Sequence, residues 1–129
     1  MEYKDLIGVP FKEGGRTTTG MDCYGLVVEI YRRMGRLIDD PQEYRYSGPK
    51  GEPIDLGAYT RLWREVRGAW QEGDVLLFED GLFRPCMHCA VVLDGGRILH
   101  ATDTCGVVTS PLRHYLNKVT KVYRWIRES

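Results

Sequence analysis

The sequence has 129 residues, of which 43% are hydrophobic and 28% charged, and its formal net charge at pH 7 is zero. These values are typical of one globular domain over residues 1–129 with a single hydrophobic core. The balanced charge gives no electrostatic basis for binding nucleic acid or an anionic membrane, and no apolar run has the length of a membrane span.

The N-terminal third begins with Met-Glu-Tyr-Lys-Asp, which is not a signal peptide. We therefore expect synthesis in the cytoplasm, and any export by another route. The apolar residues within 2–9 predict a short helix that ends at Gly8-Val9-Pro10, and residues 11–20 predict a loop.

A helix that begins at or just before Asp22 and ends at Gly35 is the central predicted element. Cys23 lies in its first turn, where backbone amides and the positive end of the helix dipole favour a thiolate and can hold an oxyanion. Taken alone, Cys23 is more simply a small buried hydrophobic residue. The apolar positions recur at intervals of three and four, as in an amphipathic helix with one buried stripe: Cys23, Leu26, Val27, Ile30, Tyr31 and Met34.

Residues 36–69 give no regular pattern, because prolines and glycines interrupt them. We interpret them as an irregular insertion that runs over the surface and rims a cleft. Within it, residues 59–66 predict one helix that carries Trp63. Trp63 and Trp70 either line a glycopeptide groove or anchor the packing, and large apolar side chains more often do the latter.

The second half of the chain predicts strands rather than helices. Residues 111–117 predict one or two helical turns that begin at a proline. Helices followed by a run of antiparallel strands indicate an α+β fold. The strands are expected at 75–78, 88–93, 97–102, 106–109 and 119–126; in the last, Tyr123 and Trp125 share one face and Val122, Arg124 and Ile126 the other.

Two of the expected strands form a hairpin that places two histidines together. If Asp94-Gly95-Gly96 is a three-residue turn, Leu93 pairs with Arg97, and His88 and His100 lie on the same face within reach of each other. A two-residue turn would place the histidines on opposite faces. The composition of the turn thus allows a pair of imidazoles.

These residues suggest a catalytic triad. Cys23 would be the nucleophile, His88 the general base and later the general acid, and His100 the group that orients His88.

A zinc site is the alternative interpretation, because Cys86 and Cys89 have the spacing of one knuckle, with Cys105 and His100 as further ligands. A second paired knuckle is missing, however, and Cys89 would point away from His88. We therefore expect no metal, and we interpret Cys89 as a core residue. Without a secretory signal the cysteines do not indicate a disulfide framework, and His114 is expected at the surface.

Five segments occur in an order and with spacings that resemble the NlpC-type cell-wall peptidases, a family of papain-like cysteine peptidases. The resemblance runs from about Leu6 to Ile126, and the stretch from Pro111 to Trp125 looks most like the branch encoded with phage tail genes. The segments are Gly20–Val27, Gly73–Phe78, Met87–Leu93, Arg97–Ala101 and Gly106–Val108.

The resemblance implies a papain-like fold with N-terminal helices on a central antiparallel sheet of about five to six strands. It implies hydrolysis of an amide in peptidoglycan stem peptides, typically next to D-glutamate, by Cys23, His88 and His100 through a thioester, without a cofactor. It also implies phage tail proteins as partners and a location in the virion.

The sequence departs from the family pattern near the expected substrate site. Tyr24 stands where members usually have Ser, and Phe11 where many have Tyr, so both bear on substrate preference. Asp22 matches an Asp that binds a substrate amine in some members, but it is equally an N-cap. The alternatives to a peptidase are a phage tail component without catalytic activity and an enzyme that acts on another amide or acyl group.

Overall fold

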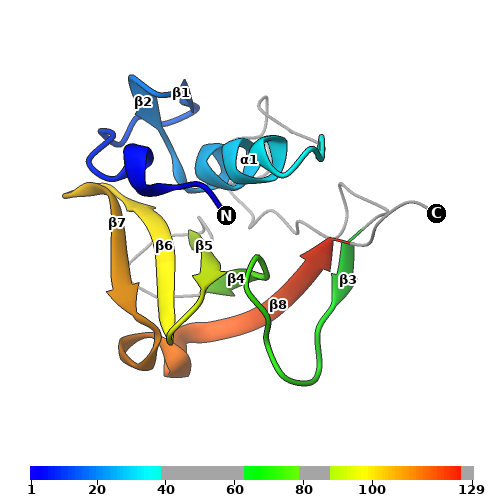
Figure 1. Cartoon of the computed structure of the whole chain (residues 1–129). Coiled ribbons are helices and arrows are strands. Elements are labelled where there is room, and N and C mark those ends of the chain that lie inside the picture. Colours follow the sequence, from blue (N-terminus) through cyan, green and yellow to red (C-terminus); the bar gives the residue numbers. More distant parts are fainter. Residues whose placement is uncertain (39–62, 79–87, 126–129) are drawn as a thin grey trace, which may run out of the picture.

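The computed structural model describes residues 1–38, 63–78 and 88–125 (Figure 1). Its first elements are the 3-10 turn η1 (Lys4–Leu6), the short strands β1 (Arg16–Thr17) and β2 (Gly20–Met21) and the helix α1 (Cys23–Arg33). Strands β3 (Trp63–Glu65), β4 (Val75–Phe78), β5 (His88–Leu93), β6 (Arg97–Thr102) and β7 (Gly106–Pro111), the 3-10 turns η3 (Leu112–His114) and η4 (Leu116–Lys118) and strand β8 (Val119–Trp125) follow.

The described strands β3 to β8 form a six-stranded antiparallel sheet in the order β3-β8-β4-β5-β6-β7. Helix α1 and the N-terminal segment lie on one side of this sheet (Figure 1). The α+β prediction is confirmed. The N-terminal segment also joins strand β7 through backbone hydrogen bonds, from Gly8 N–H to the Val107 carbonyl and from Val107 N–H to the Val9 carbonyl, both 2.9 Å long.

Both faces of the sheet bury apolar side chains, in agreement with the alternation expected along a strand. The helix-side core contains Leu26 and Ile30 of α1 together with sheet residues such as Val91 and Leu99. The predicted face of Tyr123 and Trp125 belongs to this core, and Val122 lies on the other face, as expected. The outer core consists of Leu76, Phe78, Ala90, Val92, Ile98 and Val122.

The prediction of a helix over residues 59–66 is wrong for its described part. Trp63–Glu65 forms strand β3, in which Trp63 lies opposite Trp125 on β8. The Trp63 ring packs against Trp125 and Tyr31, with ring centroids 5.1 and 5.2 Å apart. This burial, together with pairing to β8, outweighs the local helical spacing. Trp63 is therefore a packing anchor, whereas residues 59–62 lie outside the described part.

The N-terminal predictions also need correction. The helix expected within residues 2–9 is only the turn η1, and the loop expected at 11–20 contains the paired strands β1 and β2, in which Arg16 lies opposite Met21. The turns expected over 111–117 are present as η3 and η4. No helix in the described residues is long and apolar enough to cross a membrane.

The β5–β6 hairpin has the predicted register, with Leu93 opposite Arg97 and Val91 opposite Leu99. Asp94-Gly95-Gly96 is a three-residue turn, and both glycines have a φ of 74°, in the left-handed region that glycine adopts at least cost. This turn fixes which face of the sheet each hairpin side chain occupies.

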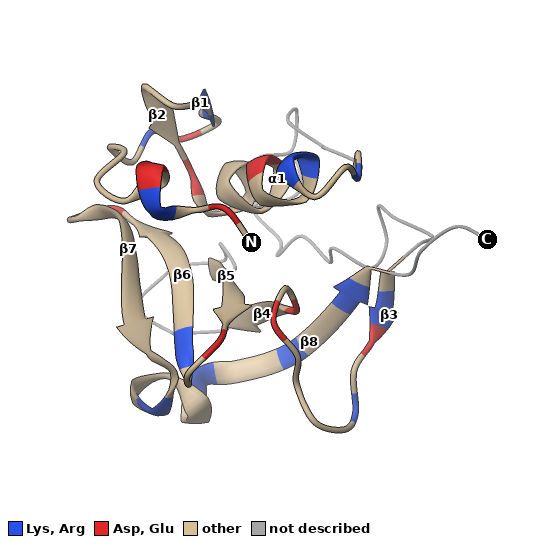
Figure 2. Cartoon of the chain, in the orientation of Figure 1, with Lys and Arg blue, Asp and Glu red and all other residues tan. Residues whose placement is uncertain are grey.

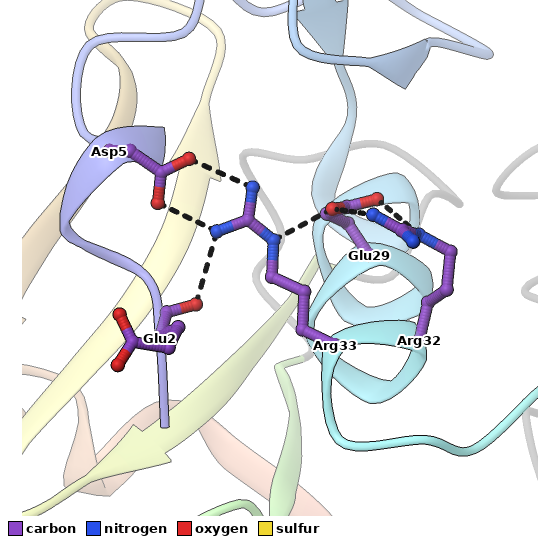
Figure 3. A network of polar contacts seen from close by, with 5 residues as sticks. All are labelled: Glu2, Asp5, Glu29, Arg32 and Arg33. Atoms are coloured by element: carbon purple, nitrogen blue, oxygen red, sulfur yellow. Dashed lines mark hydrogen bonds and ion pairs between the residues drawn. The ribbon is translucent and has the colours of Figure 1, made fainter.

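A network of charged side chains holds α1 against the N-terminal segment. Acidic and basic residues lie close together on η1 and α1 (Figure 2). The nearly buried Glu29 accepts hydrogen bonds from Arg32 and Arg33, at 2.6 and 2.7 Å, and Arg33 also binds both carboxylate oxygens of Asp5 (Figure 3). The network fixes the second half of α1, whose first turn carries the candidate nucleophile.

Candidate active site

Asp22 caps the helix that carries Cys23. Its backbone is extended, and its carboxylate Oδ1 accepts hydrogen bonds from Gly25 N–H at 2.6 Å and from Arg16 Nη1 at 2.8 Å. Its Oδ2 accepts a third, from Gly14 N–H at 2.7 Å. Asp22 is thus the N-cap that the sequence allowed, and it ties the preceding loop to the first turn of the helix. Its role toward a substrate amine stays a prediction.

The Cys23 thiol lies at the boundary between α1 and strand β5. It is 4% exposed and forms hydrogen bonds with the side chains of Cys89 and His88. Burial acts to raise the pKa of Cys23, but the hydrogen bonds and the charge of His88 outweigh burial and lower this pKa to about 6. A thiol with this pKa is mainly a nucleophilic thiolate at neutral pH.

His88 and His100 form the predicted pair of imidazoles. His88 Nε2 lies 2.9 Å from His100 Nδ1, which leaves Nδ1 of His88 as the ring nitrogen available to Cys23. Phe78 stacks on the His88 ring, with centroids 5.5 Å apart and planes inclined at 24°. Tyr115 meets the His100 ring edge-on at 5.2 Å. Cys23, His88 and His100 therefore form one continuous chain of contacts.

Ser110 on β7 extends this chain by one residue. Its hydroxyl oxygen lies 2.8 Å from His100 Nε2. Burial, helped by the neighbouring His88, lowers the pKa of His100 to about 4, so this ring is neutral at pH 7 and carries one N–H. When His100 Nδ1 accepts a hydrogen bond from His88, the single proton of His100 lies on Nε2. The Nε2–H group then donates a hydrogen bond to the Ser110 hydroxyl oxygen. Ser110 is not among the predicted site residues, because the expected strand ends at residue 109, whereas β7 continues to Pro111.

Tyr24 and Phe11 lie close to the start of the helix. Tyr24 is buried, and the Arg16 guanidinium lies over its ring at 5.7 Å from the centroid. Phe11 is half-buried, forms a bridge with Met21 and packs against the helix-side core. Contacts with a substrate stay a prediction for both side chains, as does the effect of their replacing hydroxyl residues.

Two cysteines of the alternative zinc site, Cys89 and Cys105, lie in the described part of the chain. Cys89 is buried in the helix-side core next to Cys23, while Cys105 is exposed. No group of three or more His, Cys, Asp or Glu side chains in residues 1–38, 63–78 and 88–125 is placed to hold a metal ion. Cys86 lies outside these ranges. His114 is exposed, as expected.

The sequence of this chain is similar to those of known proteins. The sequence model of the NlpC/P60 family matches residues 8–125. The chain is 28% identical over 105 residues to the probable endopeptidase NlpC of Escherichia coli strain K12, covering 81% of the chain and 60% of that relative. It is 25% identical over 111 residues to the murein DD-endopeptidase MepS/murein LD-carboxypeptidase of the same strain, covering 86% of the chain and 52% of that relative. The chain thus spans little more than half the length of these relatives.

Solved structures share the fold. The NlpC/p60 domain of the peptidoglycan hydrolase SagA superposes with a TM-score of 0.58 at 21% identity, covering 92% of this chain and 89% of that one. The peptidoglycan hydrolase RipB of Mycobacterium tuberculosis gives a TM-score of 0.60 at 24% identity, covering 95% of this chain and 60% of that one. The six-stranded sheet with one packed helix is therefore a fold that these solved structures share.

Proposed function

The chain belongs to the NlpC/P60 family, a family of cysteine peptidases, and we propose that it hydrolyses an amide bond in peptidoglycan stem peptides, of the type that typically lies next to D-glutamate. One observation carries this proposal: Cys23 at the start of α1 contacts His88, which contacts His100. This is the order of nucleophile, base and orienting group that amide hydrolysis through a thioester requires. One Escherichia coli relative is a murein DD-endopeptidase and murein LD-carboxypeptidase, which supports peptidoglycan as the substrate.

The chemistry follows from the positions of the side chains. The Cys23 thiolate attacks the substrate carbonyl, and the N–H groups at the start of α1 stabilise the oxyanion that forms. The His88 imidazolium gives its proton to the leaving amine, which produces a thioester on Cys23. His88, now neutral, takes a proton from water as the water oxygen attacks the thioester carbonyl. The C–S bond then breaks, which releases the new carboxylic acid and restores the Cys23 thiolate beside the His88 imidazolium.

His100 and Ser110 act through His88. As His88 gains positive charge, its Nε2–H donates to His100 Nδ1, a hydrogen bond that strengthens when the donor is charged. The Ser110 hydroxyl oxygen accepts a hydrogen bond from His100 Nε2–H and so leaves Nδ1 as the acceptor for His88. Both are positioning residues, because neither touches the reacting atoms.

Digestion of purified peptidoglycan tests the proposal. We expect the wild-type protein to release muropeptides whose masses identify one cleaved amide, and Cys23→Ala to release none of them. Cys105→Ala is the matched control, because Cys105 is exposed and forms its contact with Thr104 rather than with the triad. Identical products from the wild type and Cys23→Ala would overturn the proposal.

The finer parts of the sequence resemblance stay predictions. The relatives described above leave the phage-tail branch untested, and with it a virion location and binding to phage tail proteins. The two alternatives are a non-catalytic role and action on another amide or acyl group. Both leave the stem peptides intact, so the same digestion distinguishes the proposed peptidase from either of them.

A further inference from the structure

Cys89 is a buried thiol that the proposed mechanism does not use. It lies on β5 directly after His88, and its side chain points into the helix-side core rather than toward the outer core, where Phe78 stacks on His88. There it forms a hydrogen bond with Cys23, and both cysteines are 4% exposed. Two thiols in direct contact at a catalytic position can be oxidised to a disulfide bond, which neither thiol can form alone.

We propose that Cys23 and Cys89 form a reversible disulfide when the protein meets a peroxide, with Cys89 as the resolving thiol. The link would occupy the nucleophilic sulfur and join the first turn of α1 to the central strand β5. Loss of peptidase activity on oxidation rests on the proposed function, whereas formation of the disulfide does not.

The reaction balances in two steps. The Cys23 thiolate attacks one oxygen of hydrogen peroxide, the O–O bond breaks, and the departing hydroxide takes the proton of the His88 imidazolium, which leaves a sulfenic acid and one water. Cys89 then loses its proton and attacks the Cys23 sulfur. The S–O bond breaks, and the departing hydroxide combines with the released proton as a second water. Two thiols are oxidised and one peroxide is reduced to two waters.

The environment of the two sulfurs separates these steps in time. The hydrogen bond to Cys23, burial and the charge of the Cys23 thiolate raise the pKa of Cys89 well above its ordinary value, so Cys89 stays protonated while Cys23 is a thiolate. Peroxide therefore reacts first with Cys23. Once Cys23 is a neutral sulfenic acid, its negative charge is gone, and Cys89 deprotonates more easily.

Mass spectrometry tests the proposal without any substrate. The parent for this test is Cys86→Ser/Cys105→Ser, which retains only Cys23 and Cys89. After limiting hydrogen peroxide we expect the mass of the parent to fall by two hydrogen atoms. Digestion should then yield a linked peptide pair containing both cysteines, and dithiothreitol should restore the original mass.

Cys89→Ala in the same background is the matched control. It should instead accumulate sulfinic acid on Cys23, which dithiothreitol does not reverse. Absence of the linked pair from the oxidised parent, or the same irreversible oxidation with and without Cys89, overturns the proposal. If Cys89→Ala does not fold, Cys89→Val serves as the control, and the parent alone still decides whether the link forms.

Assays on peptidoglycan separate this proposal from the proposed function. A linked pair in a protein that cleaves no peptidoglycan supports the disulfide and contradicts the peptidase. In an active parent, activity should fall in proportion to the linked fraction and return with dithiothreitol.

Discussion

At the scale of single residues, the reactivity of Cys23 is the property most directly set by its contacts. The pKa of its thiol is lowered to about 6, because the hydrogen bonds from Cys89 and His88 outweigh burial. We expect the rate of its alkylation by iodoacetamide to rise through about pH 6 and to level off above it. In His88→Ala the rise should move toward the ordinary range of a free thiol, about pH 8.5.

Peptide mapping of the alkylated protein supplies the internal control for this prediction, since Cys105 is exposed and can be followed in the same sample. A Cys23 that reacts no faster than Cys105 at neutral pH contradicts the activated thiolate.

Ser110 gives a second prediction at this scale. A neutral hydrogen bond contributes about 1 kcal/mol, so Ser110→Ala should lower the rate of cleavage by roughly fivefold to tenfold. Nitrogen NMR of the labelled histidines should show His100 losing its preference for a proton on Nε2, which a merely structural change would not produce. Ser110→Thr should restore both values.

Thr109→Ala is the neighbouring control, because Thr109 binds Arg97 rather than a histidine. An unchanged His100 tautomer in Ser110→Ala would exclude the positioning role.

The residues of the proposed triad could be predicted from the sequence, but their supporting contacts could not. Cys23 follows from a helix start, and His88 with His100 from the register of one hairpin, all of which are local patterns. Ser110 reaches His100 across strands β6 and β7, and Cys89 reaches Cys23 across the helix–sheet boundary. Contacts of this kind depend on how elements pack, which spacing along the chain does not encode.

At the scale of elements, the first turn of α1 depends on close packing with the preceding loop. A Cβ atom on Gly25 would lie 2.1 Å from the Gly15 carbonyl oxygen and 3.1 Å from Asp22 Oδ1. Because the first of these neighbours is backbone, the loop or the helix start must move to accept a side chain. We therefore expect Gly25→Ala to lower the free energy of unfolding by about 1–3 kcal/mol and to slow alkylation of Cys23.

Urea denaturation and the alkylation assay measure both effects. Gly68→Ala is the control, because a Cβ atom there meets nothing within 4 Å and should leave both values unchanged. If Gly25→Ala matches the wild type in both, the packing of this loop does not set the position of Cys23.

Strongly patterned elements were predictable, and short ones were not. Helix α1 and strands β4, β5 and β6 carry clear periodicity or continuous apolar runs, and the structure places them where the sequence predicts. Strand β3 has only three residues, and its pairing with β8 depends on a distant segment. The β1–β2 hairpin is shorter still, so turn residues alone indicated a loop.

At the scale of the whole molecule, the sheet order brings the active-site elements together. Strands β5, β6 and β7 are consecutive neighbours, and α1 packs across β5 and β6 on one face. Cys23, His88, His100 and Ser110 therefore come from the adjacent elements α1, β5, β6 and β7. The order β3-β8-β4 depends on the return of the last strand to the middle of the sheet, which no local pattern indicates.

The most direct test of catalysis by Cys23 is the detection of the thioester intermediate on this residue. The protein is mixed with a purified muropeptide, quenched in acid within the first turnover, digested and mapped by mass. We predict an acyl group on Cys23 whose mass equals the carbonyl side of the cleaved stem peptide, and none on Cys89 or in His88→Ala. Turnover of the muropeptide without an acyl group on Cys23, or with the acyl group on another cysteine, would contradict covalent catalysis by Cys23.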